Sequence, residues 1–393
     1  MRTHGWPLRP DITYLNHGTV GVTPDVVLAA QAAIRARMER EPAQFLFREA
    51  SGLTGISPRR PSLVREAAAA VAGHMGARGE DLVFVDNATA GVNAVLRSLR
   101  FSPGDEVLVL DHAYGAVVNA VRHIAGGQGA RVVTARVPYP AFSAAGVVEA
   151  VRAGLSGRTR LAILDHVTSE SALILPLAEM ARVCRAQGVA VLADGAHAPG
   201  MLPLDLPSLG VEWYVANLHK WACAPRSCGF LWADPRVQAD LHPVVISWGF
   251  DTGLAAEFDW VGTRDVSAWL AAPAGFDFLA KQGVHAVWTH NHGLAVDAAG
   301  ILSAAWGTRS EVPESAIGFM VSVPVPAALG SDAVAARTLR DALLFEHQIE
   351  VQVHAAHGQV WTRVSAQVYN DRVDVERLAT AVQALAARGR SGM

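Results

Sequence analysis

Short apolar runs alternate with helical patterns through the middle of the chain. Seven such runs are LVFVD from 82, EVLVL from 106, RVVTARV from 131, RLAILDHV from 160, GVAVLAD from 188, VEWYVAN from 211 and CGFLWAD from 228. Strands that are apolar on both faces and alternate with helices indicate an open, mainly parallel sheet covered on both sides. The pattern therefore predicts a doubly wound α/β domain whose ligand binds beyond the carboxyl ends of the strands.

The rest of the chain has different patterns. At the start Gly18 and Gly21 mark turns, and the pattern loosens at about 245–285. The tail after it combines helices and short strands as a small α+β domain does. Helices are predicted at about 24–40, 61–76, 284–306, 333–347 and 373–388. A chain of 393 residues is expected to form more than one core. The expected parts are an N-terminal segment at 1–60 that packs with the small domain, a large domain at 61–283 and a small C-terminal domain at 284–393.

Composition narrows the class of ligand. The 33 basic and 36 acidic residues give a net charge of −3, which favours a small-molecule substrate over nucleic acid or an anionic membrane. No stretch approaches the ~20 apolar residues that span a bilayer, and the opening residues lack the apolar core of a signal peptide. We therefore expect a cytoplasmic protein. The three cysteines match no zinc or disulfide pattern, so we expect buried thiols and no metal site.

Amine chemistry has only two side-chain candidates. Of the 33 basic residues only Lys220 and Lys281 are lysines, a bias that a GC-rich genome explains. Lys281 stands at a polar helix end, where a solvated cation is favoured. Lys220 follows a buried apolar run, so partial loss of water would lower its pKa and leave a neutral amine able to form a Schiff base.

Asp194 directly follows the apolar run from 188. A carboxylate at the end of a buried strand needs a partner. A protonated pyridinium nitrogen is such a partner, because the pairing makes the ring a better electron sink, while a metal ion or the N-terminus of the next segment are alternatives. Lys220 comes about one helix-plus-strand unit later, so we expect both side chains to reach one crevice.

Other polar residues stand near the ends of predicted strands. Thr89 is a suitable N-cap for the helix after the first run, where free N–H groups form an anion site. His112 follows the next run, where a histidine is more often a satisfied polar residue than a functional one. Ser169 either hydrogen-bonds a ligand or turns the chain. Arg363, on a predicted strand of the tail, offers a planar fork for a carboxylate or is a surface cation.

Taken together, these residues resemble the fold-type I pyridoxal phosphate (PLP) enzymes. Within them the chain is similar to the class V aminotransferase family, which includes cysteine desulfurases and isopenicillin N epimerase. The resemblance covers nearly the whole chain and is strongest from Asn16 to Asp265. The motifs most like the epimerase branch are LNHGTVGVTP, NATAGVN, DHAYGAV, DHVTSES, ADGAHAPG, NLHKWACAP and GTRD. The implied fold is a mainly parallel doubly wound sheet with a smaller α+β C-terminal domain.

The resemblance implies a role for each matching residue. Lys220 would hold PLP as a Schiff base and move the α-proton, Asp194 would pair with the ring nitrogen, and His112 would stack on the ring. Arg363 would grip the substrate carboxylate, with Asn16 also at the substrate. The other implied cofactor contacts are Ala88, Thr89, Ala90, Asn217 and His219 at the phosphate, His197 and Ser169 near the ring hydroxyl, and Thr263 at the phosphate of a neighbouring subunit. This last contact implies a homodimer with shared active sites.

Two departures from the family pattern restrict the reaction. The segment FEHQIEVQVHAAHG from 345 has no cysteine where the desulfurases carry a nucleophile, which argues against cysteine desulfurase activity. Glu170, Ser171 and Ala172 replace a turn that usually contains proline and glycine. Because that turn faces the substrate, we expect a substrate different from that of the namesake epimerase.

The reaction implied is proton removal from Cα of an amino acid by Lys220 as general base. The resemblance favours epimerisation, with β-elimination by a C–S lyase as the alternative and transamination less favoured. Epimerisation needs a proton donor opposite Lys220. The open candidates are His112, Tyr114, His354 and His357.

Two rival classes fit the sequence less well. A nucleotide-binding doubly wound protein would need a G-x-G-x-x-G turn after the first strand, which LVFVDNATAGVN lacks. A non-catalytic PLP-binding relative would keep Lys220 and Asp194 but could lose Arg363, which is present. The sequence leaves open whether Arg48 or Arg264 reaches the active site.

Overall fold

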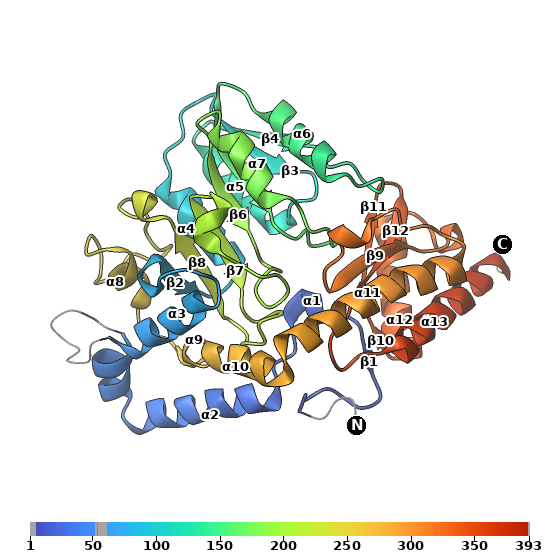
Figure 1. The fold of residues 1–393 in the computed structure, drawn as a ribbon, viewed down its shortest axis with the longest axis horizontal. Helices are drawn as coiled ribbons and strands as arrows, with labels where there is room; N and C mark the ends of the chain where they lie inside the picture. The colour runs from blue at the N-terminus through green and yellow to red at the C-terminus, as the bar shows by residue number, and fades with distance from the viewer. Residues whose placement is uncertain (1–4, 52, 54–60, 392–393) are drawn as a thin grey trace.

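A seven-stranded sheet forms the centre of the larger part of the molecule (Figure 1). The computed structural model describes residues 5–51, 53 and 61–391. The strands of this sheet are β2 (Leu82–Val85), β3 (Glu106–Leu110), β4 (Arg131–Ala135), β5 (Thr159–Asp165), β6 (Ala190–Asp194), β7 (Trp213–Asn217) and β8 (Gly229–Ala233). Their spatial order is β2-β8-β7-β6-β5-β3-β4, and β8 runs antiparallel to both of its neighbours. The predicted fold, a mainly parallel doubly wound sheet, is confirmed.

The central strands are apolar throughout because their side chains enter two cores on opposite faces. On β2, Leu82 and Phe84 join one core, and Val83 and Val85 join the other. The helices that accompany this sheet are α3 (Leu63–Gly73), α4 (Ala88–Ser98), α5 (Gly115–Gly127), α6 (Ala144–Gly154) and α7 (Leu177–Arg185). Crossovers of this kind bring the carboxyl ends of the parallel strands to one edge of the sheet.

Two helices of this part begin at residues other than those expected. The Ser62 hydroxyl accepts a hydrogen bond from the Arg65 N–H, so α3 starts at Leu63 and Pro61 lies outside it. In α4 the N-cap is Asn87, whose side-chain oxygen accepts from the Ala90 N–H at 2.9 Å. The expectation that Thr89 is the N-cap was therefore wrong. Thr89 lies in the first turn, because the extended backbone that an N-cap needs occurs two residues earlier.

The smaller part combines a three-stranded antiparallel sheet with long helices (Figure 1). Its strands, in the spatial order β11-β12-β9, are β11 (Gln352–Ala356), β12 (Gln359–Ser365) and β9 (Met320–Pro324). Its helices are α11 (Val284–Trp306), α12 (Ala333–His347) and α13 (Arg372–Ser391). A third apolar core, which includes Leu294, Val323 and Leu378, lies between this sheet and these helices. This arrangement is the small α+β unit that the tail of the sequence predicted.

The N-terminal segment contacts both parts. Its strand β1 (Thr13–Tyr14) pairs in parallel with β10 (Ile349–Glu350), and Asn16 bridges to Ser365 at the end of β12. Its helix α2 (Asp25–Arg40) instead packs against α9 (Ser267–Leu270) and α10 (Ala272–Gln282). Besides short 3-10 turns, the described residues also form α1 (His17–Val20), the π-helical η1 (Gln44–Ala50) and α8 (Leu254–Asp259). The segment therefore connects the two parts of the molecule.

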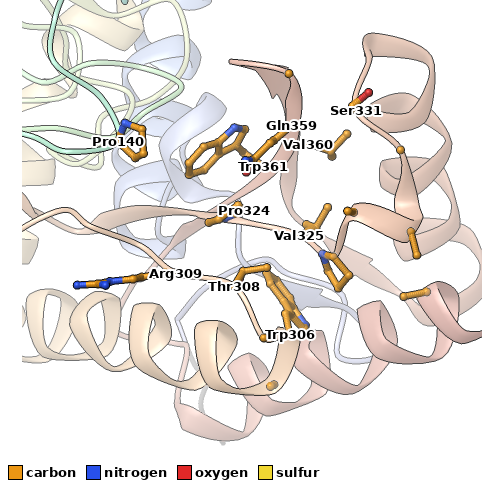
Figure 2. A pocket seen from close by; sticks show the side chains of 18 of the residues that line it. Pro140, Trp306, Thr308, Arg309, Pro324, Val325, Ser331, Gln359, Val360 and Trp361 are labelled. Carbon is orange, nitrogen blue, oxygen red and sulfur yellow. The ribbon is translucent and has the colours of Figure 1, made fainter.

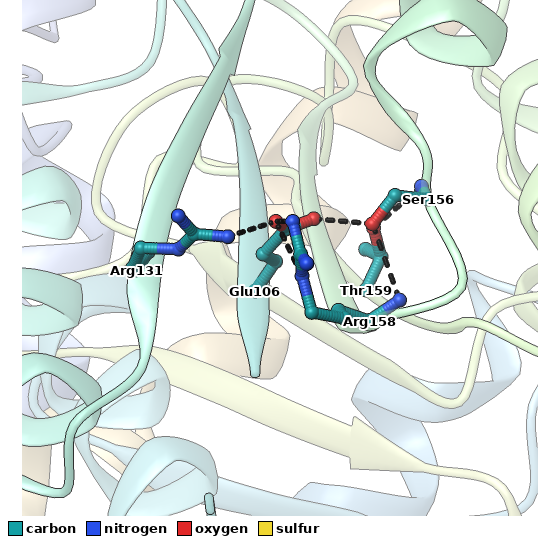
Figure 3. Close-up of polar contacts among 5 residues, drawn as sticks. All are labelled: Glu106, Arg131, Ser156, Arg158 and Thr159. Carbon is teal, nitrogen blue, oxygen red and sulfur yellow. Dashed lines mark hydrogen bonds and ion pairs between the residues drawn. The ribbon is translucent and has the colours of Figure 1, made fainter. Parts of the chain in front are cut away.

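Charged groups gather at the amino ends of the parallel strands, away from their carboxyl ends. Glu106, which is buried at the start of β3, accepts hydrogen bonds from Arg131, Arg158 and Ser156 (Figure 3). These hydrogen bonds, that of Ser156 foremost, lower the pKa of the Glu106 carboxyl. The cluster satisfies a buried charge and contributes to structure rather than to chemistry.

Two further expectations concern residues outside any site. Cys184, Cys223 and Cys228 are buried free thiols, as predicted. Among the described residues no helix is long and apolar enough to cross a membrane. The expected cytoplasmic location stays a prediction.

Candidate active site

A cavity of about 500 Å³ lies beyond the carboxyl ends of β5, β6 and β7. It brings together residues that are far apart in the chain and that the sequence predicted for one site. These are Ala88, Thr89, Ser169, Asp194, His197, Asn217, His219, Lys220 and Arg363. The position is the one that a doubly wound sheet favours for a ligand.

Lys220 lies just after β7 and is 9% exposed. Its Nζ is 3.0 Å from Nε2 of His197, whose Nδ1 accepts a hydrogen bond from the Trp221 indole N–H at 3.4 Å. An indole can only donate, so the proton of neutral His197 must reside on Nε2 and point to Lys220. Burial, with the charge of Arg363, lowers the pKa of Lys220 to about 7. The amine therefore has a large neutral fraction at neutral pH.

Two buried carboxyl groups stand side by side at the strand ends. Asp165 ends β5, Asp194 ends β6, and the two are direct partners in the register of these parallel strands. One Asp194 oxygen accepts the Ala196 N–H at 3.0 Å. Burial raises the pKa of both carboxyls, and the proximity of Asp194 raises that of Asp165 further. The site thus holds carboxyl groups suited to pair with a cationic ring nitrogen.

The N-terminus of α4 faces the same cavity through Asn87, Ala88 and Thr89. Asn217, at the end of β7, accepts the Ala88 N–H through Oδ1 at 2.8 Å, which leaves its amide group free to donate. His219 contacts the Cys228 carbonyl through Nδ1 at 2.9 Å, and burial lowers its pKa to about 4. A helix N-terminus with amide and hydroxyl donors beside it is an anion site. Ala90, in contrast, does not line the cavity.

Arg363 occupies the side of the cavity that the small part supplies. It lies on β12, is 2% exposed, and donates to the Ser169 carbonyl at 2.6 Å and the Thr19 hydroxyl at 2.8 Å. Asn16 accepts from it at 3.4 Å and so supports Arg363 without lining the cavity. Among the described residues no carboxylate forms an ion pair with Arg363. Burial lowers its pKa to about 10, so this cation is suited to an anionic ligand.

Gly21 allows the N-terminal turn to approach the loop at 218–228 that carries Lys220, here called the lysine loop. Its φ is +70°, and a Cβ there would lie 1.9 Å from the His219 carbonyl oxygen and 3.1 Å from Cα of Lys220. Any larger residue would therefore separate this turn from the loop. The turn carries Gly18 and Thr19, both of which line the cavity.

His112 lies in a neighbouring cavity of about 440 Å³ instead. Its Nδ1 is 2.6 Å from the Ser171 hydroxyl, and its ring contacts those of Tyr139 and His357. The two cavities share Tyr114, Ser169 and Glu170, so they adjoin. The stacking of His112 on a cofactor ring stays a prediction. Of the four candidates for a second proton carrier, only Tyr114 lines the cavity of Lys220.

Thr263 does not reach the cavity of its own chain. It lines a separate pocket of about 480 Å³ with Trp248, Trp260 and Arg48. Arg264 pairs with Asp86 and lies over the Trp269 ring. A cofactor contact of Thr263 would therefore have to be made in a neighbouring subunit, as the resemblance implied.

A larger cavity of about 940 Å³ lies away from these strand ends. Trp306, Pro324 and Trp361 of the small part line it, with Pro140 from the large part on its far side (Figure 2). It contains neither Lys220 nor any of the buried carboxyls. Chemistry rather than size therefore identifies the site.

These features fit one cofactor. A nucleophilic amine, a carboxylate for a ring nitrogen and an anion site at a helix N-terminus meet in one cavity, and Val167 and Ala196 add apolar surface. Asp194 keeps one oxygen without a described hydrogen-bond donor, as a pyridinium would require. Fold and site together define a PLP enzyme of fold-type I.

The chain belongs to the aminotransferase class-V family, whose model matches residues 49–378. It is 33% identical to a probable chloroplastic L-cysteine desulfhydrase of Arabidopsis thaliana, over 97% of this chain and 84% of that relative. It is 32% identical to an isopenicillin N epimerase of Streptomyces clavuligerus, over 96% of each. The expected family and cofactor are thereby confirmed.

Solved structures show the same fold. A cystine C–S lyase in complex with cysteine persulfide has a TM-score of 0.77 at 23% identity and covers 95% of this chain and 97% of that one. A cysteine desulfurase of Thermococcus onnurineus has a TM-score of 0.79 at 18% identity and covers 98% and 97%. At these identities the likeness concerns the fold.

Asp165 and Thr19 are among the residues of the cavity that sequence reasoning missed. Asp165 could have been found, because it ends an apolar run as Asp194 does. Thr19 had no such signal, since its place beside Arg363 depends on the pairing of β1 with β10.

Proposed function

We propose that the protein epimerises an amino acid at Cα, with PLP bound to Lys220. The observation that carries this proposal is the pair of adjoining cavities. The first holds Lys220 and Arg363, and the second adds about 440 Å³ beyond Tyr114, Ser169 and Glu170. An amino acid whose carboxylate binds Arg363 can extend a bulky side chain into the second cavity, which a substrate as small as cysteine would leave unfilled.

Each of these cavity residues has a proposed role in binding or proton transfer. Arg363 holds the substrate carboxylate, and Asp194 keeps the ring nitrogen protonated. Ala88, Thr89, Asn217 and His219 hold the phosphate at the N-terminus of α4. When bound, PLP supplies an electron sink that stabilises negative charge at Cα of an attached amino acid. Lys220, whose pKa is about 7, accepts the α-proton at Nζ.

Epimerisation needs a second group that returns a proton from the opposite side. We propose Tyr114 for this role, because among the candidates it alone lines the cavity of Lys220. Its phenol can donate and accept a proton at Oη. His354 and His357 lie in the second cavity, where they face the substrate side chain.

A C–S lyase is the second candidate function. It is favoured by the desulfhydrases among the relatives, which are 33% and 34% identical to this chain. β-Elimination requires one base and no second proton carrier, so Lys220 alone would suffice. The segment from 345 has no cysteine, so transfer of sulfur to the protein in the manner of a desulfurase is not proposed.

The test combines the visible spectrum with proton exchange. Purified wild type, Lys220→Ala and Lys281→Ala are supplied with PLP, and single enantiomers of amino acids are then added in deuterated water. We expect a visible band in wild type and in Lys281→Ala that Lys220→Ala lacks. Epimerisation would give deuterium at Cα in both enantiomers, whereas a lyase would release ammonia and a keto acid. A wild type that stays colourless with PLP would reject the proposal.

We also propose a homodimer with composite active sites. Exposed apolar side chains cluster just before the Thr263 loop, with Trp248 79% exposed and Ile246 54% exposed. Such a patch on a protein surface marks an interaction site. A second copy that covers it would bring Thr263 towards the phosphate site of its partner.

A further inference from the structure

Asp165 is a buried acid in the cavity for which the proposed mechanism has no use. It is 3% exposed and ends β5, directly beside Asp194, which is 5% exposed and ends β6. Partners in register on neighbouring strands point to the same face of a sheet, with backbones about 4.8 Å apart. Both carboxyls line the cavity of Lys220. The two carboxyls are therefore neighbours on one face of the sheet, where the strands meet the cavity.

The surroundings offer Asp165 no positive charge. Among the described residues no other residue donates a hydrogen bond to its carboxyl or forms an ion pair with it. Its own backbone N–H is the one hydrogen-bond donor that lowers its pKa, against the larger effect of burial. His166 follows Asp165 directly, and its Nδ1 is 2.8 Å from the Tyr214 hydroxyl of β7. Burial lowers the pKa of His166 to about 4. His197 is neutral as well, because burial lowers its pKa well below the usual value.

The two cations of the cavity are placed elsewhere. The charge of Lys220 acts on Asp194, where it lowers the pKa of the carboxyl. Burial, which raises that pKa, is the larger effect. Arg363 is engaged with Ser169 and Thr19 on the side of the small part. Two adjacent buried carboxylates with so little compensation cannot both stay ionised, and one of them keeps its proton.

We propose that Asp165 is a positioning residue that stays a carboxylic acid and donates a hydrogen bond to the carboxylate of Asp194. The pair then carries one negative charge, which matches the single positive charge of a protonated ring nitrogen. The donated hydrogen bond occupies one side of Asp194 and directs its remaining lone pairs to the ring. This inference rests on the proposed function only in so far as the protein binds PLP through Lys220.

The proposal predicts which substitutions Asp165 tolerates. Asparagine has the same shape and also offers a neutral donor, so Asp165→Asn should preserve the hydrogen bond to Asp194. Leucine has a similar volume but no donor. In Asp165→Leu, no hydrogen bond from position 165 would then stabilise the negative charge of Asp194. Without that hydrogen bond the Asp194 carboxylate attracts nearby positive charge more strongly, which favours the protonated form of the link between PLP and Lys220. The pH midpoint of that link should then rise.

The experiment is a spectral titration of PLP-loaded wild type, Asp165→Asn and Asp165→Leu. The visible band is followed from acid to alkaline pH without substrate, so the readout does not depend on activity. We expect wild type and Asp165→Asn to share a midpoint and that of Asp165→Leu to lie about 1 unit higher, a tenfold change in the proton equilibrium. The idea is overturned if Asp165→Asn moves as far as Asp165→Leu, or if neither moves.

A second measurement remains decisive if Asp165→Leu does not fold. The infrared difference spectrum between loaded wild type and Asp165→Asn at neutral pH should contain the carbonyl band of a protonated carboxylic acid. If only carboxylate bands differ, Asp165 is ionised and the proposal is rejected. Failure of the proposed function would appear differently, as a wild type without a visible band or without exchange at Cα.

Discussion

The pKa of the Lys220 amine depends on charged residues that are far from it in the sequence. Burial and Arg363 lower its pKa to about 7, and Asp194 opposes them. Arg363 comes from β12 in the small part, so the side chain that we propose to bind the substrate carboxylate also lowers the pKa of the amine. Under that proposal, substrate binding and amine activation are coupled through a single guanidinium.

The pH dependence of cofactor loading checks this coupling. Only the neutral amine attacks an aldehyde, so the loading rate of apo protein should rise with pH and level off above about 7. Below the inflection the rate should fall about tenfold per pH unit. Stopped-flow absorbance measures it, with pyridoxal lacking the phosphate as a control for titration of the phosphate site.

Arg363→Gln provides the matched variant for that measurement. Loss of the positive charge removes one cause of the low pKa of Lys220, so the inflection should move to higher pH. Because Arg363 is also the proposed ligand of the substrate carboxylate, the KM of the variant should rise as well. An inflection that stays near pH 7 in the variant would show that burial alone sets it.

At the residue scale, the sequence predicted which residues belong to the cavity better than it predicted what each of them contacts. Asp194, Lys220 and Arg363 could be predicted because each carries a charge within or at the end of an apolar run. That His112 would lie beside Ser171 could not be predicted, because it depends on the conformation of the turn at 169–172. Asn16, which was expected at the substrate, accepts a hydrogen bond from Arg363 and does not line the cavity, so its contact with a substrate stays a prediction.

At the element scale, the N-terminal turn at Gly21 fixes the lysine loop. Gly21→Ala would combine a left-handed backbone with a Cβ 1.9 Å from the His219 carbonyl oxygen. We expect a loss of about 3 kcal/mol or more in unfolding free energy and weaker PLP binding, because the loop must move. Urea unfolding and titration with PLP measure the two effects.

Gly188→Ala is the control for backbone strain. Gly188 has a φ of +69°, nearly that of Gly21, but a Cβ there meets nothing within 4 Å. The variant should lose only about 1 kcal/mol, the cost of the left-handed backbone, and keep its affinity for PLP. Equal losses in both variants would mean that the contact with the loop is unimportant.

The elements themselves were largely predictable from hydrophobic periodicity. The strands of the central sheet, α11 and α12 lie at the expected positions because each has a clear period or a clear stop. The start of α4 was displaced because two residues could cap it, and backbone conformation selects Asn87 over Thr89. The pairing of β1 with β10 has no local signal at all.

At the scale of the whole molecule, the proposed composite site predicts complementation between subunits. Lys220→Ala and Thr263→Ala should each lose activity, but a mixed dimer has one site with both wild-type residues. After exchange of subunits, about a quarter of the wild-type sites should be restored. Assays of the mixture against the separate variants measure this recovery.

The control is a mixture of Lys220→Ala with Arg363→Ala. Both residues line the same cavity of one chain, so no mixed dimer contains an intact site. Recovery in this control, or none with Thr263→Ala, would contradict the proposed arrangement. A single-chain mass in sedimentation at working concentration would do so as well.

The pairing of β1 with β10 affects the order in which the two sides of the cavity form during synthesis. During synthesis Lys220 and Asp194 leave the ribosome well before β10 and Arg363, which follow more than a hundred residues later. Until then the N-terminal segment lacks its strand partner, and the cavity lacks its wall on that side. We therefore expect the growing chain to form its cofactor-binding sheet first and to acquire its grip on amino acids only as translation ends.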